Sequence, residues 1–79
     1  AKKGNHKAAA ARYLEATRWN PEYSQAYWKL GKSHEKLKSA KDAIEAYHTY
    51  LSVDPQGKHA KTIRTRIVNL ATMLNENKQ

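Results

Sequence analysis

Two prolines divide this chain. Pro21 and Pro55 each follow a segment with the apolar spacing of a helix. Proline has no backbone N–H and restricts the residue before it, so each proline marks the end of a helix. The interval between the two prolines matches the period of about 34 residues, with two helices in each period, that is typical of one class of helix-turn-helix repeats. We therefore predict an all-α fold, in which antiparallel helices joined by short turns form a repeat array.

The second half of this period also occurs earlier in the chain. A shift by the interval between the prolines aligns residues 1–20 with the segment that leads to Pro55, and only the second helix of the period recurs. The two copies of this helix are expected to hold their tyrosines in equivalent places in the core. The aligned pairs are Ala9 with Ala43, Tyr13 with Tyr47, and Pro21 with Pro55.

A chain of 79 residues is long enough for one small domain. We predict that residues 1–20 are the second helix of a truncated repeat, residues 21–56 a complete repeat, and residues 57–79 a capping helix with one apolar stripe. Asn5 and Ser39 are expected to cap their helices with their side chains. The four helices are expected near Asn5–Arg18, Glu22–Leu37, Ala40–Val53 and Lys58–Leu74.

Six residues of the complete repeat carry a family resemblance. A large residue and then Leu-Gly mark the first helix, Ala and an aromatic residue mark the second, and Pro follows. This pattern resembles the tetratricopeptide repeat family, which implies an α-solenoid fragment that binds proteins through its concave face. His34 departs from the pattern, which usually has Tyr there, and Tyr50 departs where Ala is usual. The matching residues are Tyr27, Leu30, Gly31, Ala43, Tyr47 and Pro55.

Gly31 needs a packing reason, because glycine inside a helix costs about 1 kcal/mol relative to alanine. Two antiparallel helices approach closely only where the residues at their contact are small. We predict that Gly31 lies opposite Ala43 at such a contact, and that a larger residue at position 31 destabilises the helix pair.

Lysines recur on one face of the first helix of the complete repeat. Lys29, Lys32 and Lys36 are spaced three and four residues apart, with Gln25 and Trp28 beside them. The resemblance implies that this face lines the concave groove, where an acidic peptide or a free carboxylate with an apolar neighbour would fit. The alternative is a solvated helix face with Trp28 packed on a flanking helix. The family's carboxylate clamp has Asn where Lys29 stands, so that clamp is not reproduced.

The sequence predicts no catalytic site, metal or cofactor. It contains no cysteine, and acids such as Glu35 look like surface residues. His34-Glu35 opens like a zinc-protease helix, but residue 38 is Lys where a second His is required. His34 is expected to be satisfied between packed helices, and the protein is predicted to be a non-enzyme.

Two other functions stay open. The net charge of +8 comes from residues 1–20 and 57–79, at +4 each, which permits contact with nucleic acid or an anionic surface. Homo-dimerisation is the other, because the first helix lacks its usual partner and is expected to leave Ala10, Leu14 and Thr17 uncovered. No apolar run reaches the roughly 18 residues of a membrane span. The candidate phosphate contacts are Lys2, Lys3, Lys7, Arg12, Lys61, Arg64 and Arg66.

Overall fold

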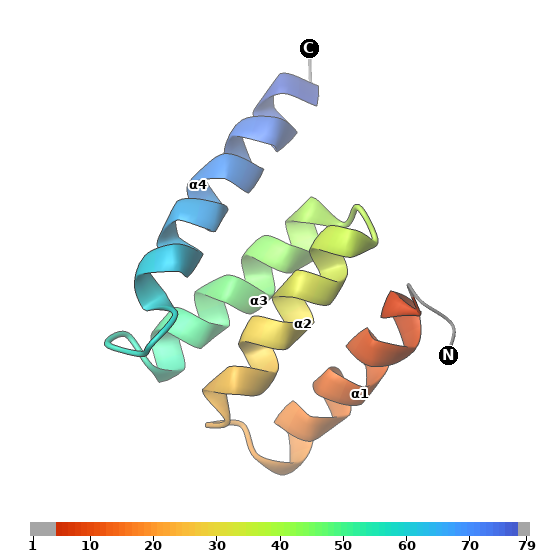
Figure 1. Cartoon of the computed structure of the whole chain (residues 1–79), viewed down its shortest axis with the longest axis vertical. Coiled ribbons are helices and arrows are strands. Elements are labelled where there is room, and N and C mark those ends of the chain that lie inside the picture. The colour runs from red at the N-terminus through yellow and green to blue at the C-terminus, as the bar shows by residue number, and fades with distance from the viewer. Residues whose placement is uncertain (1–4, 78–79) are drawn as a thin grey trace.

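The computed structural model describes residues 5–77, which form four helices in antiparallel succession (Figure 1). No strand occurs in this part of the chain. The predicted all-α repeat fold is therefore confirmed. The helices are α1 (His6–Trp19), α2 (Ser24–Lys36), α3 (Ala40–Val53) and α4 (Ala60–Asn77).

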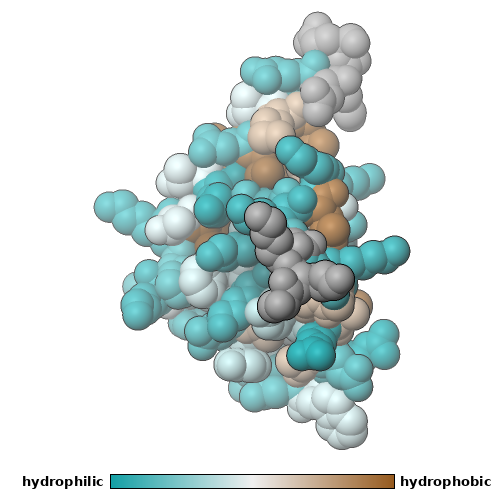
Figure 2. Space-filling model, turned by 45° about the vertical axis from the view of Figure 1, so that its right-hand side comes forward, coloured by the Kyte–Doolittle hydropathy of each residue, from teal (hydrophilic) through white to brown (hydrophobic). Residues whose placement is uncertain are grey.

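Each helix packs mainly on the helices before and after it in sequence: α1 on α2, α2 on α3, and α3 on α4. This order of contacts is that of a solenoid, in which each unit is stabilised by its neighbours. The last helix is the longest, and in Figure 1 its C-terminal end extends beyond the turn between α2 and α3. Hydrophilic side chains cover most of the face shown in Figure 2.

The helix ends differ from the prediction by zero to three residues. The bounds of α3 are as predicted, and α1 begins after Asn5, whose side chain accepts a hydrogen bond from the N–H of Ala8 at 3.3 Å. Ser39 stands at the cap position of α3, but its side chain makes no capping bond. The helix α2 begins two residues late, because Pro21 and Glu22 form a turn in which Tyr23 donates its N–H to the carbonyl of Asn20 at 3.0 Å.

The core is built around Tyr47, whose side chain is 0% exposed. A Cβ built on Gly31 would lie 2.5 Å from Cδ1 and 2.8 Å from Cζ of the Tyr47 ring. The three atoms nearest to this Cβ all belong to Tyr47, so the ring, rather than the predicted Ala43, is what requires the glycine. The buried members of this cluster are Ala43, Tyr47, Tyr50, Ala60, Ile63 and Leu70.

A smaller cluster joins α1 to the rest of the molecule. It consists of Ala10, Leu30 and Ala46, with Tyr13 packed against it. Ala10 and Thr17 are buried, which corrects the expectation that α1 leaves them uncovered. Leu14 is 49% exposed and fits that expectation.

The two tyrosines of the internal repeat also differ. Tyr13 is only partly buried, whereas Tyr47 is fully buried. The prediction of equivalent core places is therefore wrong. The physical reason is that Tyr47 has helices on both sides, since α3 packs on both α2 and α4, whereas α1 packs mainly on α2.

Candidate functional site

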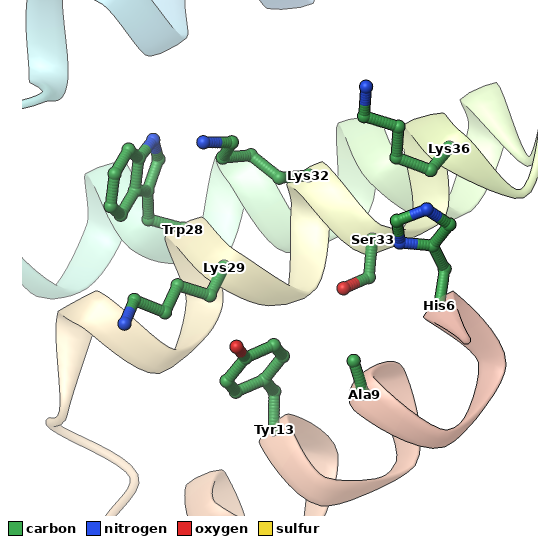
Figure 3. A pocket seen from close by; sticks show the side chains of 8 residues that line it. All are labelled: His6, Ala9, Tyr13, Trp28, Lys29, Lys32, Ser33 and Lys36. Atoms are coloured by element: carbon green, nitrogen blue, oxygen red, sulfur yellow. The ribbon is translucent and has the colours of Figure 1, made fainter. Parts of the chain in front are cut away.

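A groove runs between α1 and α2 and has a volume of about 290 Å³ (Figure 3). We call it the α1–α2 groove. In Figure 3, His6, Ala9 and Tyr13 rise toward it from α1, and the other labelled side chains come from α2. Its lining is completed by Trp28, Lys29, Lys32, Ser33 and Lys36.

The groove brings together four of the five residues that the sequence analysis proposed as a binding face. Trp28, Lys29, Lys32 and Lys36 all line it, and no acidic residue within 5–77 does. Gln25 lies elsewhere, in a separate hollow beside Asp54 and the turn between α3 and α4. Its spacing places it on the lysine face, but it lies in the first turn of α2 and does not line the groove.

Trp28 has one contact outside the groove and one within it. Its ring stacks on His59 with 3.7 Å between ring centroids and 8° between the ring planes. The His59 backbone N–H donates to the hydroxyl of Tyr50 at 3.1 Å, so the turn that carries His59 is tied to α3. Lys32 Nζ lies 4.7 Å from the centroid of the Trp28 ring, within cation–π distance. Trp28 therefore both packs on a flanking segment and lines the groove.

Tyr50 departs from the family pattern, which usually has Ala at this position. Its ring is buried, and its hydroxyl accepts the hydrogen bond that orients the His59 turn. An alanine at this position has no hydroxyl to offer. The unusual tyrosine therefore helps to place the ring on which Trp28 stacks.

Glu35 is the centre of a contact between three helices. The buried hydroxyl of Tyr47 donates to its Oε2 at 2.5 Å, and Arg66 Nη1 of α4 lies 3.2 Å from its Oε1. Burial, reinforced by Glu35, raises the pKa of the Tyr47 phenol, so this group stays protonated and donates at neutral pH. Glu35 is therefore not the free surface acid that the sequence suggested. The sequence did not reveal its two partners because they lie on other helices, α3 and α4.

A second hollow, of about 390 Å³, lies beside the groove. We call it the basic recess. Lys32 and Lys36 line both hollows, so the two are neighbours. The basic recess is lined by Lys32, Glu35, Lys36, Lys38 and Arg66.

His34 does not have the satisfied packing that was expected of it. Its Nδ1 is buried and has no hydrogen-bond partner among the described residues. The ring lines a hollow on the other side of α2, together with Leu14 and Glu45. No group of three or more His, Asp or Glu side chains within the described residues has the arrangement of a metal site.

Among the described residues, the cations proposed as phosphate contacts are divided between α1 and α4. Lys2 and Lys3 lie outside the described residues, and Lys7 and Arg12 belong to α1, at the opposite end of the array from α4. On α4, Arg66 pairs with Glu35, and Arg64 Nη2 donates to the carbonyl of Pro55 at 3.1 Å.

Two family models match the chain, and both cover the helix that carries the lysine face. A model described as "TPR repeat" matches residues 1–38, and one described as "Tetratricopeptide repeat" matches residues 24–56, so both include α2. No curated protein and no solved structure matches. None of the four described helices is both long and apolar enough to cross a membrane.

Proposed function

Because this chain belongs to the tetratricopeptide repeat family, we propose that it is a protein-binding module that holds a partner peptide in the α1–α2 groove. Repeats of this family generally mediate protein–protein interaction, and the family is typically non-catalytic. The observation that carries the proposal is the lining of the groove, in which three lysines stand beside the side chains of Trp28 and Tyr13.

The lining suits a peptide that is both apolar and acidic. Ala9, Tyr13 and Trp28 offer apolar surface to an aliphatic or aromatic side chain, and Trp28 is already held by His59, so little ordering is needed on binding. Lys29, Lys32 and Lys36 would attract carboxylates on the same peptide. Exposed pairs of this kind contribute only about 0.2–1 kcal/mol each, so the apolar contacts must supply much of the affinity.

The division of the chain stays a prediction. We propose that α4 acts as a capping helix, because it packs on α3 and contributes Ile63 and Leu70 to the buried cluster that contains Tyr47. The match to the family models extends only to residue 56, which supports a different role for the segment that follows.

The test uses Trp28 as the reporter of binding. Trp19 is 82% exposed, so Trp19→Phe removes the other indole without disturbing the core. In this background, a Leu-containing acidic peptide with a free C-terminus is titrated, and duplex and single-stranded oligonucleotides are titrated separately. We expect the peptide to change Trp28 fluorescence and to bind less tightly to Lys29→Gln and Lys36→Gln.

Lys41→Gln is the matched control. Lys41 is exposed on α3 and lines neither the groove nor the recess, but its substitution removes the same charge. If Lys41→Gln and Lys36→Gln lose the same amount of peptide affinity, the effect comes from net charge alone, and peptide binding in the groove is refuted. Binding of oligonucleotides only, with loss in moderate salt, would favour the nucleic-acid alternative.

A further inference from the structure

We propose that the basic recess binds the phosphate of a phosphorylated residue in the partner peptide. This inference rests on the proposed function, because the peptide held in the α1–α2 groove would deliver the phosphorylated side chain. Lys32 and Lys36 line both hollows, so a peptide in the groove has the recess directly beside it. In Figure 3 both lysines project from the same side of α2.

The charge of the recess suits a dianion. Four cations surround it, and its one acid, Glu35, already accepts a hydrogen bond from Tyr47 through Oε2 and pairs with Arg66 through Oε1. The net charge of the lining is thus +3, counted from four cations and one carboxylate. A phosphorylated residue carries about −1.5 to −2 at neutral pH and offers three acceptor oxygens, whereas a single carboxylate offers −1 and two.

Arg66 is oriented before any ligand arrives. Glu35 holds Nη1 of Arg66, while the Arg66 side chain remains 42% exposed. A guanidinium has five N–H donors in a rigid plane, so engaging one edge with Glu35 still leaves donors for a phosphate. Fixing the guanidinium in advance lowers the entropic cost of binding.

Lys38 is placed by an unusual backbone conformation. It follows the C-cap of α2 with φ of 64°, the left-handed region that favours glycine. The Lys38 N–H donates to the carbonyl of Glu35 at 3.0 Å, and the Ser39 N–H donates to the carbonyl of His34 at 2.8 Å. These two bonds define a Schellman motif, in which this position is most often Gly. A lysine here is unfavourable for the turn but adds a cation to the recess.

The arrangement of the four cations distinguishes the recess from a nucleic-acid-binding surface. The four cations come from α2, the α2–α3 turn and α4, and they surround one hollow. A nucleic-acid backbone presents a row of regularly spaced phosphates, which calls for cations spread along a surface. A single phosphate beside an apolar groove fits this arrangement better.

The test compares peptides that differ only in phosphorylation. The acidic peptide probe is prepared unmodified and with one phosphoserine at each of several successive positions, and binding is followed by Trp28 fluorescence in the Trp19→Phe background. We expect one phosphopeptide to bind about tenfold more tightly than the unmodified peptide, the gain that one charge-assisted contact gives. If phosphorylation raises the affinity at none of these positions, phosphate binding in the recess is refuted, and the proposal of peptide binding in the groove is unaffected.

The variants Lys38→Gly and Lys38→Asn separate binding from folding. Both residues tolerate the left-handed conformation, so the turn is retained while the cation is lost. We expect both to abolish most of the phosphate-dependent gain and to leave the affinity for the unmodified peptide unchanged. The matched control, Lys41→Gln, should keep the gain. Equal phosphopeptide binding by wild type and both variants would refute the assignment of Lys38.

A free phosphorylated amino acid tests phosphate binding in the recess independently of peptide binding in the groove. O-phosphoserine is titrated into the ¹⁵N-labelled protein, and the amide signals of Lys38 and Arg66 are followed. Shifts at these residues that Lys38→Gly suppresses would support the recess, even if the peptide probe fails to bind the groove. Shifts spread over all exposed lysines, or oligonucleotide binding that Lys38→Gly weakens more than phosphoserine binding, would overturn it.

Discussion

Replacing Gly31 with alanine tests the contact between α2 and α3. The added methyl group would overlap the ring of Tyr47, at 2.5 Å from Cδ1 and 2.8 Å from Cζ. The ring cannot move aside freely, because it is 0% exposed and its hydroxyl is bonded to Glu35. Either the two helices separate or the ring shifts, and both movements strain the hydrogen bond between Tyr47 on α3 and Glu35 on α2.

The expected free-energy change follows from three contributions. Alanine is favoured over glycine inside a helix by about 1 kcal/mol, which stabilises the variant. Overpacking costs about 1–3 kcal/mol, and loss of a hydrogen bond to a charged acceptor costs about 1.5–3 kcal/mol. The variant is therefore expected to lose about 1.5–5 kcal/mol of unfolding free energy. Gly31→Leu, with a larger side chain, is expected to lose at least as much.

Urea unfolding followed by far-UV circular dichroism measures this loss. With a urea dependence of about 1 kcal/mol per molar, typical of a small domain, the midpoint should fall by about 1.5 M or more. Asn69→Ala is the control: Asn69 is exposed on α4, so alanine there gains helix propensity without overlap and should raise the midpoint slightly. A Gly31→Ala midpoint equal to or above that of wild type would refute the requirement for glycine.

Two further predictions concern the residues around Glu35. Burial and Glu35 raise the pKa of Tyr47, so the folded state keeps the phenol proton at a pH where the unfolded chain loses it. The contribution of Tyr47 to stability is therefore constant below about pH 10 and falls above it by up to about 1.4 kcal/mol per pH unit. Urea midpoints measured across this range should show this fall in wild type and not in Tyr47→Phe, and parallel profiles would contradict it. Lys38→Gly should stabilise the α2–α3 turn by about 1 kcal/mol, since glycine adopts the left-handed conformation without steric cost, and a lowered thermal midpoint would contradict this reasoning.

The helices could be predicted from the sequence because their signals are local. Pro55 ends α3 and Asn5 caps α1, and both act on residues within one turn of themselves. The start of α2 was predicted two residues early, because the turn after Pro21 depends on a bond between Asn20 and Tyr23 rather than on apolar spacing. Local rules therefore place helices well and their ends less well.

One part of the candidate site could be predicted from the sequence and the other part could not. The lysine face of α2 follows from helical periodicity, and three of its lysines do line the groove. The basic recess could not be predicted, because Glu35 and Arg66 are far apart in the sequence and meet only when α4 folds back over α3. No pattern within one helix indicates that pairing. The one local sign was a lysine after the end of α2, where a helix commonly has glycine.

Packing and recognition are joined through Glu35. The ring of Tyr47 requires glycine at position 31, and the hydroxyl of the same side chain holds Glu35 from the core side. Glu35 in turn holds Arg66, which lines the recess. Tyr47, which belongs to the repeat signature because of its packing, thus also fixes the position of Arg66 through Glu35. Since each link depends on the one before, a change at Gly31 that displaces the Tyr47 ring would alter the geometry of the recess as well as the stability of the helix pair.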